Sequence, residues 1–158
     1  MCGRYVVKNP VTKTSSLVKS AIQVEDTENY NAHPYQKLPV IKKYKNGNTL
    51  ENLKWGLLPS WAKDKDFKSL INARLETIGI KKSFASLKRC VFVSDGYYEW
   101  RRRGKLKIPY YHYVPIKFLY FAGLCNNLGC VVVTMDSFQY LSEIRKTKNF
   151  RKFLKFEI

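Results

Sequence analysis

The sequence predicts an α+β fold in which mostly antiparallel strands curl into a barrel-like sheet, with only a few short helices. Two observations support this class. Runs rich in β-branched and aromatic residues recur through the second half of the chain, bounded by Gly, Pro or Asn. Segments with helical periodicity are few and short. At 158 residues and 45% hydrophobic content, the chain has the size of one domain with a single core.

The N-terminal third predicts one helix and one hairpin. The helix is expected at 15–24, where SSLVKSAIQV spaces apolar residues at helical period behind a serine cap. After a polar segment come two strand-like runs, LPVIKKY at 38–44 and TLENLKWGL at 49–57. The KNGN between them contains Asn46-Gly47, a dipeptide that accepts the positive φ of a tight turn. The two runs should therefore pair as a hairpin.

The second half predicts further strands and little helix. KKSFASLKR at 81–89 suits one or two helical turns. The strand-like runs are CVFVSDGYYEW at 90–100, IPYYHYV at 108–114, FLYFAGLC at 118–125 and CVVVTM at 130–135. The last stretch, 145–158, is strongly basic, with phenylalanines three residues apart, and suits either a frayed tail or an amphipathic helical end.

Charge is the strongest compositional signal. The chain has 29 Lys and Arg against 12 Asp and Glu, for a net charge of +17. Such a surface attracts polyanions, and nucleic acid is the partner that we expect. The 15% aromatic content favours single strands, since rings among cations suit unstacked bases. The alternative is a solvated charged face, or the basic composition of a whole proteome, with no nucleic-acid role.

The sequence gives no sign of a membrane span, a signal peptide or a bound cofactor. No apolar run approaches the roughly 18 residues of a spanning helix, so we expect a cytoplasmic, monomeric protein with no membrane contact. The four cysteines, Cys2, Cys90, Cys125 and Cys130, show no CxxC or Cys/His ligand spacing. We therefore expect free thiols, no metal and no organic cofactor.

Several short islands occur in a distinctive order. They are MCGRY at 1–5, YNAHPYQ at 30–36, WGLLPSWAKD at 55–64, INARLETI at 71–78, RCVFVSDGYYEW at 89–100, PYY at 109–111 and FAGL at 121–124. In this order they resemble the SRAP (SOS response-associated peptidase) family, the abasic-site processing proteins that shield damaged single-stranded DNA. The resemblance covers 1–144 as one domain and leaves 145–158 as a divergent basic tail. It implies that Met1 is removed and that Cys2 becomes the reactive N-terminus.

The chemistry of an abasic site explains why a cysteine would stand there. The ring-opened sugar carries an aldehyde at C1′, which an amine attacks to give a Schiff base and which a neighbouring thiol closes into a thiazolidine. Only an N-terminal cysteine offers both groups at 1,2 spacing. Its α-amine has a pKa of about 7.7 to 8.0, whereas that of lysine is about 10.4, so more of the α-amine is neutral at cellular pH. The resemblance thus implies Cys2 as the covalent nucleophile, with abasic-site lyase activity through the Schiff base.

The resemblance also implies roles for other residues. Glu99 would assist ring-opening and proton transfer, Asn72 would orient the sugar, and Arg4 and Arg74 would clamp the flanking phosphates. It places Pro34, Trp55, Trp61, Trp100 and Thr134 at the DNA-binding surface, with His33 as a structural neighbour. Each of these residues also has an ordinary structural explanation. Tryptophans most often lie in the core or at its rim, and a lone asparagine often caps a turn. Arginines and a strand glutamate often lie at the surface in contact with solvent, and a threonine hydroxyl often forms a hydrogen bond with the backbone.

The chain departs from the family pattern after VVVTMDSFQYLSEI. Where the family continues with I-H-x-R-M-P, Arg145 stands in place of the histidine. A guanidinium stays charged and cannot act as a base, so the resemblance implies an impaired member that traps DNA but releases it poorly. Two other functions stay open. One is a non-catalytic binder of single-stranded nucleic acid, and the other is a hydrolase, a peptidase or autoprotease, that uses Cys2 on an acyl group.

Overall fold

The computed structural model describes residues 3–18, 21–62, 67–115 and 119–134, and strands dominate them. The strands are β1 (Tyr5–Lys8), β2 (Ala21–Ile22), β3 (Glu28–Ala32), β4 (Lys37–Tyr44), β5 (Gly47–Lys54), β6 (Asn72–Arg74), β7 (Lys88–Ser94), β8 (Gly96–Arg103), β9 (Leu106–Tyr113), β10 (Leu119–Cys125) and β11 (Cys130–Thr134). The helical elements are α1 (Pro10–Thr14) and the 3₁₀ helix η1 (Lys82–Phe84). The prediction of mostly strands with a few short helices is confirmed.

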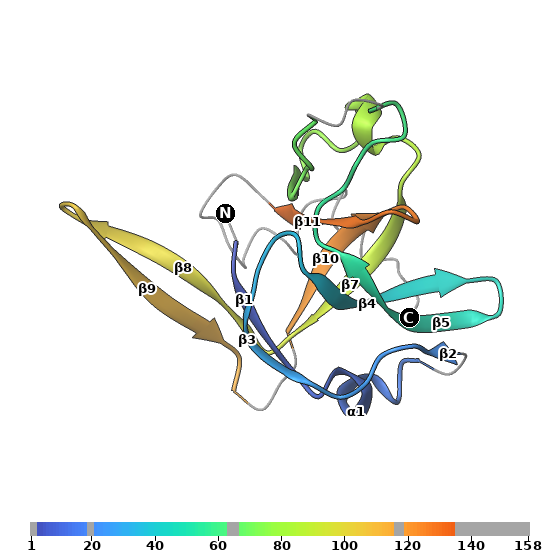
Figure 1. Ribbon diagram of the computed structural model, residues 1–158, viewed down its shortest axis with the longest axis horizontal. Helices are drawn as coiled ribbons and strands as arrows, with labels where there is room; N and C mark the ends of the chain where they lie inside the picture. Colours follow the sequence, from blue (N-terminus) through green and yellow to red (C-terminus); the bar gives the residue numbers. More distant parts are fainter. Residues whose placement is uncertain (1–2, 19–20, 63–66, 116–118, 135–158) are drawn as a thin grey trace.

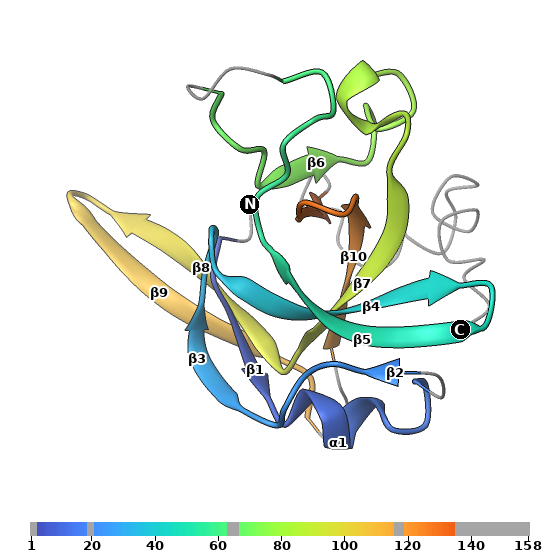
Figure 2. The same ribbon diagram turned by 45° about the vertical axis from the view of Figure 1, so that its right-hand side comes forward.

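The strands form two sheets. One has the order β3-β1-β8-β9, and the other has the order β2-β5-β4-β7-β10-β11-β6. Most neighbours are antiparallel, but β6 runs parallel to β11 and β2 runs parallel to β5. The expected barrel-like closure is not confirmed, because the described strands leave each sheet with two edges. The β8–β9 hairpin projects as a long arm away from the larger sheet (Figures 1 and 2).

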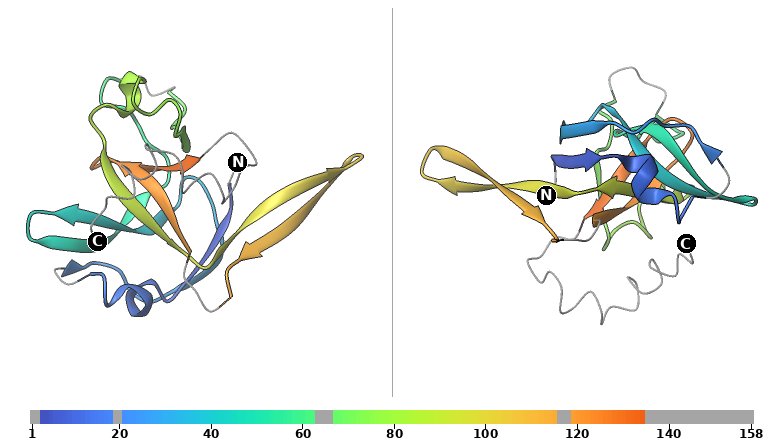
Figure 3. Two further views of the ribbon diagram at one scale, coloured as in Figure 1. Left: turned by 180° about the vertical axis from the view of Figure 1, so that it is seen from behind. Right: turned by 90° about the horizontal axis from the view of Figure 1, so that it is seen from below.

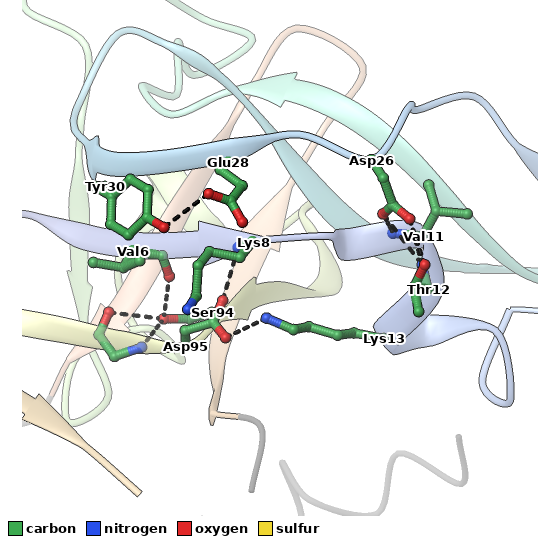
Figure 4. Close-up of polar contacts among 11 residues, drawn as sticks. Val6, Lys8, Val11, Thr12, Lys13, Asp26, Glu28, Tyr30, Ser94 and Asp95 are labelled. Atoms are coloured by element: carbon green, nitrogen blue, oxygen red, sulfur yellow. Dashed lines mark hydrogen bonds and ion pairs between the residues drawn. The ribbon is translucent and has the colours of Figure 1, made fainter. Parts of the chain in front are cut away.

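One residue carries the chain from the larger sheet to the smaller one. The run at 90–100, expected as a single strand, divides at Asp95 into β7 and β8. The Asp95 N–H donates to the Val6 carbonyl (2.8 Å), and the Asp95 carboxylate accepts the Lys8 N–H (2.8 Å). The same carboxylate pairs with the Lys13 ammonium at the end of α1 (Figure 4). This corner therefore ties β1 and α1 to the point where β8 begins.

The helix expected at 15–24 is wrong. The helix lies earlier, at 10–14, with Pro10 in its first turn, where the missing N–H costs no hydrogen bond. Asp26 accepts the N–H groups of Val11 (2.7 Å) and Thr12 (3.2 Å). Its hydrogen bond with the Thr12 hydroxyl is the main reason that the pKa of Asp26 is lowered. Further along, Ala21–Ile22 pairs with β5, so the apolar spacing there serves a turn and a short strand.

Other expectations for the elements are met in part. The hairpin at 38–57 is confirmed as β4–β5, with the positive φ (122°) at Gly47. The helical turn at 81–89 is confirmed as η1. The strands β1, β3 and β6 were not expected, since they are short and two of them carry mostly polar residues. The expected tail at 145–158 lies outside the described residues.

Trp55 is the largest fully buried side chain of the core. Its ring lies 5.6 Å from that of Tyr5 on β1 and 6.1 Å from that of Phe92 on β7. Its indole N–H donates to the Ile71 carbonyl, one residue before β6 (2.7 Å). One side chain therefore joins both sheets and the short edge strand β6.

Replacing Trp55 should be far more costly than replacing an exposed tryptophan. Trp55→Ala is expected to lower the free energy of unfolding by about 3 to 5 kcal/mol, because it leaves a cavity in the core. Trp61→Ala is the matched control and should cost less than about 1 kcal/mol, since Trp61 is 54% exposed. Urea unfolding followed by circular dichroism measures both. Equal losses for the two variants would contradict the central position of Trp55.

Candidate functional site

A pocket of about 210 Å³ lies at the β6 edge of the larger sheet. It is lined by Leu70, Asn72, Arg74, Lys81, Ser83, Phe84 and Thr134. The parallel register of β6 and β11 pairs Arg74 with Thr134, which brings these distant residues together. Three of the residues predicted from sequence, Asn72, Arg74 and Thr134, therefore share one pocket.

Asn72 has an unusual environment in this pocket. Its carboxamide oxygen is buried and has no hydrogen-bond partner in the part of the chain that the structure describes. Leaving a buried acceptor unpaired costs about 1 to 3 kcal/mol, so native proteins rarely keep one without a use. Asn72 also lines the pocket, so this oxygen is a candidate acceptor for a hydrogen bond from a ligand.

Two cations give the pocket its charge. Arg74 ends β6, and its carbonyl accepts the N–H groups of Thr77 (3.0 Å) and Ile78 (3.1 Å), which fixes the turn behind it. Lys81 adds a second cation at the start of the η1 segment. A pocket with two cations and an unpaired acceptor suits a ligand that has both an anion and a hydroxyl group.

Trp55 does not serve as a stacking platform. The side chain is fully buried, so no face of the indole is open to a base, and its predicted place on the DNA-binding surface is wrong. Trp55 instead positions residues of the site. The indole packs on Tyr5 and donates to the Ile71 carbonyl, and these residues directly adjoin Arg4 and Asn72. Trp55 thus holds the pocket at a set position relative to the start of β1.

Glu99 lies on β8, and Arg4 directly precedes the neighbouring strand β1. The register pairs Tyr5 with Tyr97, and the Tyr98 N–H donates to the Arg4 carbonyl (2.9 Å). The half-buried Glu99 therefore stands beside the segment that leads to the N-terminus. The Arg4 guanidinium donates to the Asn31 carboxamide oxygen on β3 (3.2 Å). Cys2 lies outside the described residues, and so does Arg145.

The remaining predicted residues lie outside the lining of this pocket. Pro34 is half-buried in the turn after β3, where the next residue, Tyr35, donates its N–H to the Trp55 carbonyl (2.6 Å). The His33 ring nitrogen Nδ1 is 2.8 Å from the Pro34 carbonyl oxygen, in keeping with a structural role. Trp61 packs edge-on against Phe67, with ring centroids 5.3 Å apart. Trp100 lies on the projecting hairpin and is 40% exposed.

Four residues of the pocket are not predicted from the sequence: the apolar Leu70 and Phe84, and the polar Lys81 and Ser83. Lys81 and Ser83 belong to the segment 81–89, for which the sequence predicts only a helical turn. The adjacent lysines Lys81 and Lys82 are the feature of the sequence that could have indicated a binding role for this segment. Their positions in the sequence do not show which of the two side chains faces β6.

The described residues contain no group of three or more His, Cys, Asp or Glu side chains that could hold a metal ion. Cys90, Cys125 and Cys130 are buried with free thiols. Burial raises the pKa of the Cys90 and Cys130 thiols, which keeps both protonated. Among the described helices, none has the length and apolar character needed to cross a membrane.

Comparisons with known proteins show which family this chain resembles. The family described as "SOS response associated peptidase (SRAP)" matches residues 1–149. The abasic site processing protein YoqW of Bacillus subtilis is 36% identical over 117 residues, which are 69% of this chain and 52% of that protein. The abasic site processing protein YoaM of the same organism is 31% identical, over 91% of this chain and 71% of that protein.

A solved structure supports the fold. A crystal structure of a protein from Bacteroides thetaiotaomicron is 24% identical, with a TM-score of 0.72 over 99% of this chain and 82% of that one. The chain spans about half the length of YoqW, 52%. Because the family model matches nearly all of the chain, and relatives above 30% identity agree with it, this chain belongs to the SRAP family.

Proposed function

We propose that this protein recognises abasic sites in single-stranded DNA and joins them covalently to Cys2 after removal of Met1. The observation that carries the proposal is the unpaired Asn72 oxygen in a pocket with two cations, held by Trp55 near the start of β1. The relatives named as abasic site processing proteins and the net charge of +17 support the same substrate.

The reaction would use both functional groups of an N-terminal cysteine. The neutral α-amine attacks the C1′ aldehyde of the ring-opened sugar, and loss of one water gives the Schiff base. The thiol then adds to the imine carbon, its proton passes to the nitrogen, and a thiazolidine ring closes. Residue 2 is two residues before Arg4, so the chain allows at most about 7 Å between their Cα atoms.

The described residues would support this chemistry from two directions. Glu99, on the strand beside Arg4, would give and take protons as the sugar opens and as water leaves. The Asn72 oxygen would accept a hydrogen bond from the sugar, with Thr134 nearby in the pocket lining. Arg4, Arg74 and Lys81 would hold flanking phosphates, since charge-assisted contacts to phosphate position a strand.

The same Schiff base would also permit strand cleavage by β-elimination, which makes lyase activity part of this proposal. Two other functions are outcomes of its tests. A non-catalytic binder would retain DNA without any covalent product. A peptidase would use the Cys2 thiolate on an acyl group and would leave abasic DNA unmodified.

Cys2→Ala, made so that Ala becomes the mature N-terminus, should abolish the heat-stable DNA adduct on a denaturing gel. The reason is that alanine keeps the amine but cannot close the thiazolidine. Binding to undamaged strands should change by less than about threefold, because no phosphate contact is removed. Cys130→Ala is the matched control, since it removes a buried thiol. A heat-stable adduct in Cys2→Ala would overturn the thiazolidine assignment.

Asn72→Ala should separate function from stability. Adduct formation is expected to slow at least tenfold, because the sugar loses the hydrogen bond that orients it. The free energy of unfolding should not fall, and is expected to rise by up to about 3 kcal/mol, because the variant removes a buried acceptor that has no described partner. Single-turnover gel assays and urea unfolding measure the two effects. A destabilised variant with an unchanged rate would make Asn72 a structural residue.

Arg74→Ala should weaken binding to single-stranded DNA more at low salt than at high salt. Removing one phosphate contact lowers the slope of log affinity against log salt by about 0.7 for a single strand. Arg4→Ala should behave alike. Lys45→Ala, at the distant turn of the β4–β5 hairpin, provides the matched control and should leave the slope unchanged. If all three variants keep the native slope, these arginines do not contact phosphate.

A further inference from the structure

The β8–β9 hairpin carries a row of aromatic residues on one face. Its register pairs Tyr98 with Tyr111, Trp100 with Pro109, and Arg102 with Lys107. Residues directly opposite each other in an antiparallel pair share one face of the sheet, as do residues two apart on a strand. We call the aromatic face the set formed by Tyr98, Trp100, Tyr111 and Tyr113, together with Arg102 and Lys107 beyond them toward the tip of the arm.

The rings of this face form a continuous series. Tyr111 and Tyr113 are stacked, with centroids 5.5 Å apart and planes 16° from parallel. Tyr98 lies 5.1 Å from Tyr111 and 6.5 Å from Trp100. Trp100, Tyr111 and Tyr113 are 40%, 42% and 60% exposed. The protein thus holds four large rings in contact with one another and leaves three of them widely open to solvent.

Gly96 shows that the position of Tyr111 is built into the backbone. A Cβ atom at residue 96 would lie 2.6 Å from the Tyr111 ring carbon Cζ and from its hydroxyl oxygen. The ring therefore crosses the strand over Gly96, a place that only glycine leaves open. A larger residue there would clash with the Tyr111 ring and also, at 2.5 Å, with the His112 carbonyl oxygen.

The opposite face of the hairpin has a different role. There Tyr97 stacks on His112 (5.0 Å) and packs edge-on against Phe121 of the core (5.9 Å). Glu99 follows Tyr97 by two residues and shares its face. The aromatic face is thus turned away from Glu99, and the arm that bears it projects from the body of the protein in every view (Figure 3).

We propose that the aromatic face binds single-stranded DNA outside the lesion, with bases stacked on its rings and phosphates on Arg102 and Lys107. Exposed rings beside cations match unstacked bases and their backbone, whereas a duplex hides the faces of its bases. The stretch from Trp100 to Pro115 holds five Lys and Arg and no Asp or Glu, so its charge complements a polyanion. The inference rests on the proposed function for the identity of the strand.

The test measures binding of an undamaged oligothymidylate of roughly 12 nucleotides by fluorescence anisotropy. Tyr111→Ala and Tyr113→Ala should each weaken binding at least about fivefold, the lower end of the loss known for a stacked base. Tyr111→Phe should keep native affinity, because stacking needs the ring and not the hydroxyl. Tyr44→Ala is the matched control, since Tyr44 is 43% exposed and lies on the larger sheet.

A second strand of equal length, with abasic spacers in place of all bases, separates stacking from charge. The native protein should bind it more weakly, and the two alanine variants should bind it as the native protein does. If the two alanine variants lose the same affinity for the oligothymidylate and for the abasic strand, base stacking is not the cause of binding. If both alanine variants bind the oligothymidylate with native affinity, the whole inference is wrong. It is also wrong if sedimentation shows that the native protein is a dimer and that Tyr113→Ala is a monomer, because the rings would then contact a second copy of the chain.

The two proposals fail separately. Loss of the adduct with ring-dependent binding intact would overturn only the proposed function. Ring-independent binding with the adduct intact would overturn only this inference. Circular dichroism is used to check that each variant folds. If Tyr111→Ala does not fold, Tyr113→Ala still decides the test, because Tyr113 is the most exposed ring of the series.

Discussion

The buried hydrogen bond from the Trp55 indole to the Ile71 carbonyl (2.7 Å) constrains the rest of the structure. An indole N–H without an acceptor is costly in a core, so the segment before β6 must stay where its carbonyl meets the ring. The same ring packs on Tyr5 of the smaller sheet and on Phe92 of the larger one. The relative positions of the two sheets and of the pocket edge are thus set by one side chain.

The functional residues lie at the ends of elements that this core holds. Asn72 begins β6, directly after the carbonyl that Trp55 binds, and Arg4 directly precedes Tyr5. The hydrogen bond from the Asp95 N–H to the Val6 carbonyl sets where β8 begins and therefore where Glu99 lies along β1. The Asn72 oxygen, buried without a described hydrogen-bond partner, is a stability cost. Such a cost is typical of a side chain kept for ligand binding.

The projecting hairpin separates two tasks on its two faces. Tyr97 anchors one face to the core, and that face presents Glu99. The other face exposes the aromatic series and is flanked by cations. Alternation along a strand makes this separation possible, because neighbouring residues point to opposite sides. A short run, YYEW, can therefore supply both a proton-transfer group and rings for base stacking.

The sequence alone determined the strand-rich character, the β4–β5 hairpin, the net positive charge and the family. Each rests on local pattern, composition or the order of short motifs. The sequence also predicts Cys2 as the nucleophile, because only an N-terminal cysteine offers the amine and the thiol that the proposed reaction needs.

Only the tertiary structure decided which residues meet. The helix expected at 15–24 was wrong because packing and the Asp26 contacts outweigh apolar spacing over so short a segment. The tryptophans look alike in sequence, yet Trp55 is buried and Trp100 is open, because burial depends on which strands pair. Arg74 and Thr134 join through the parallel pairing of β6 with β11, a contact between residues far apart in the chain that no local periodicity encodes.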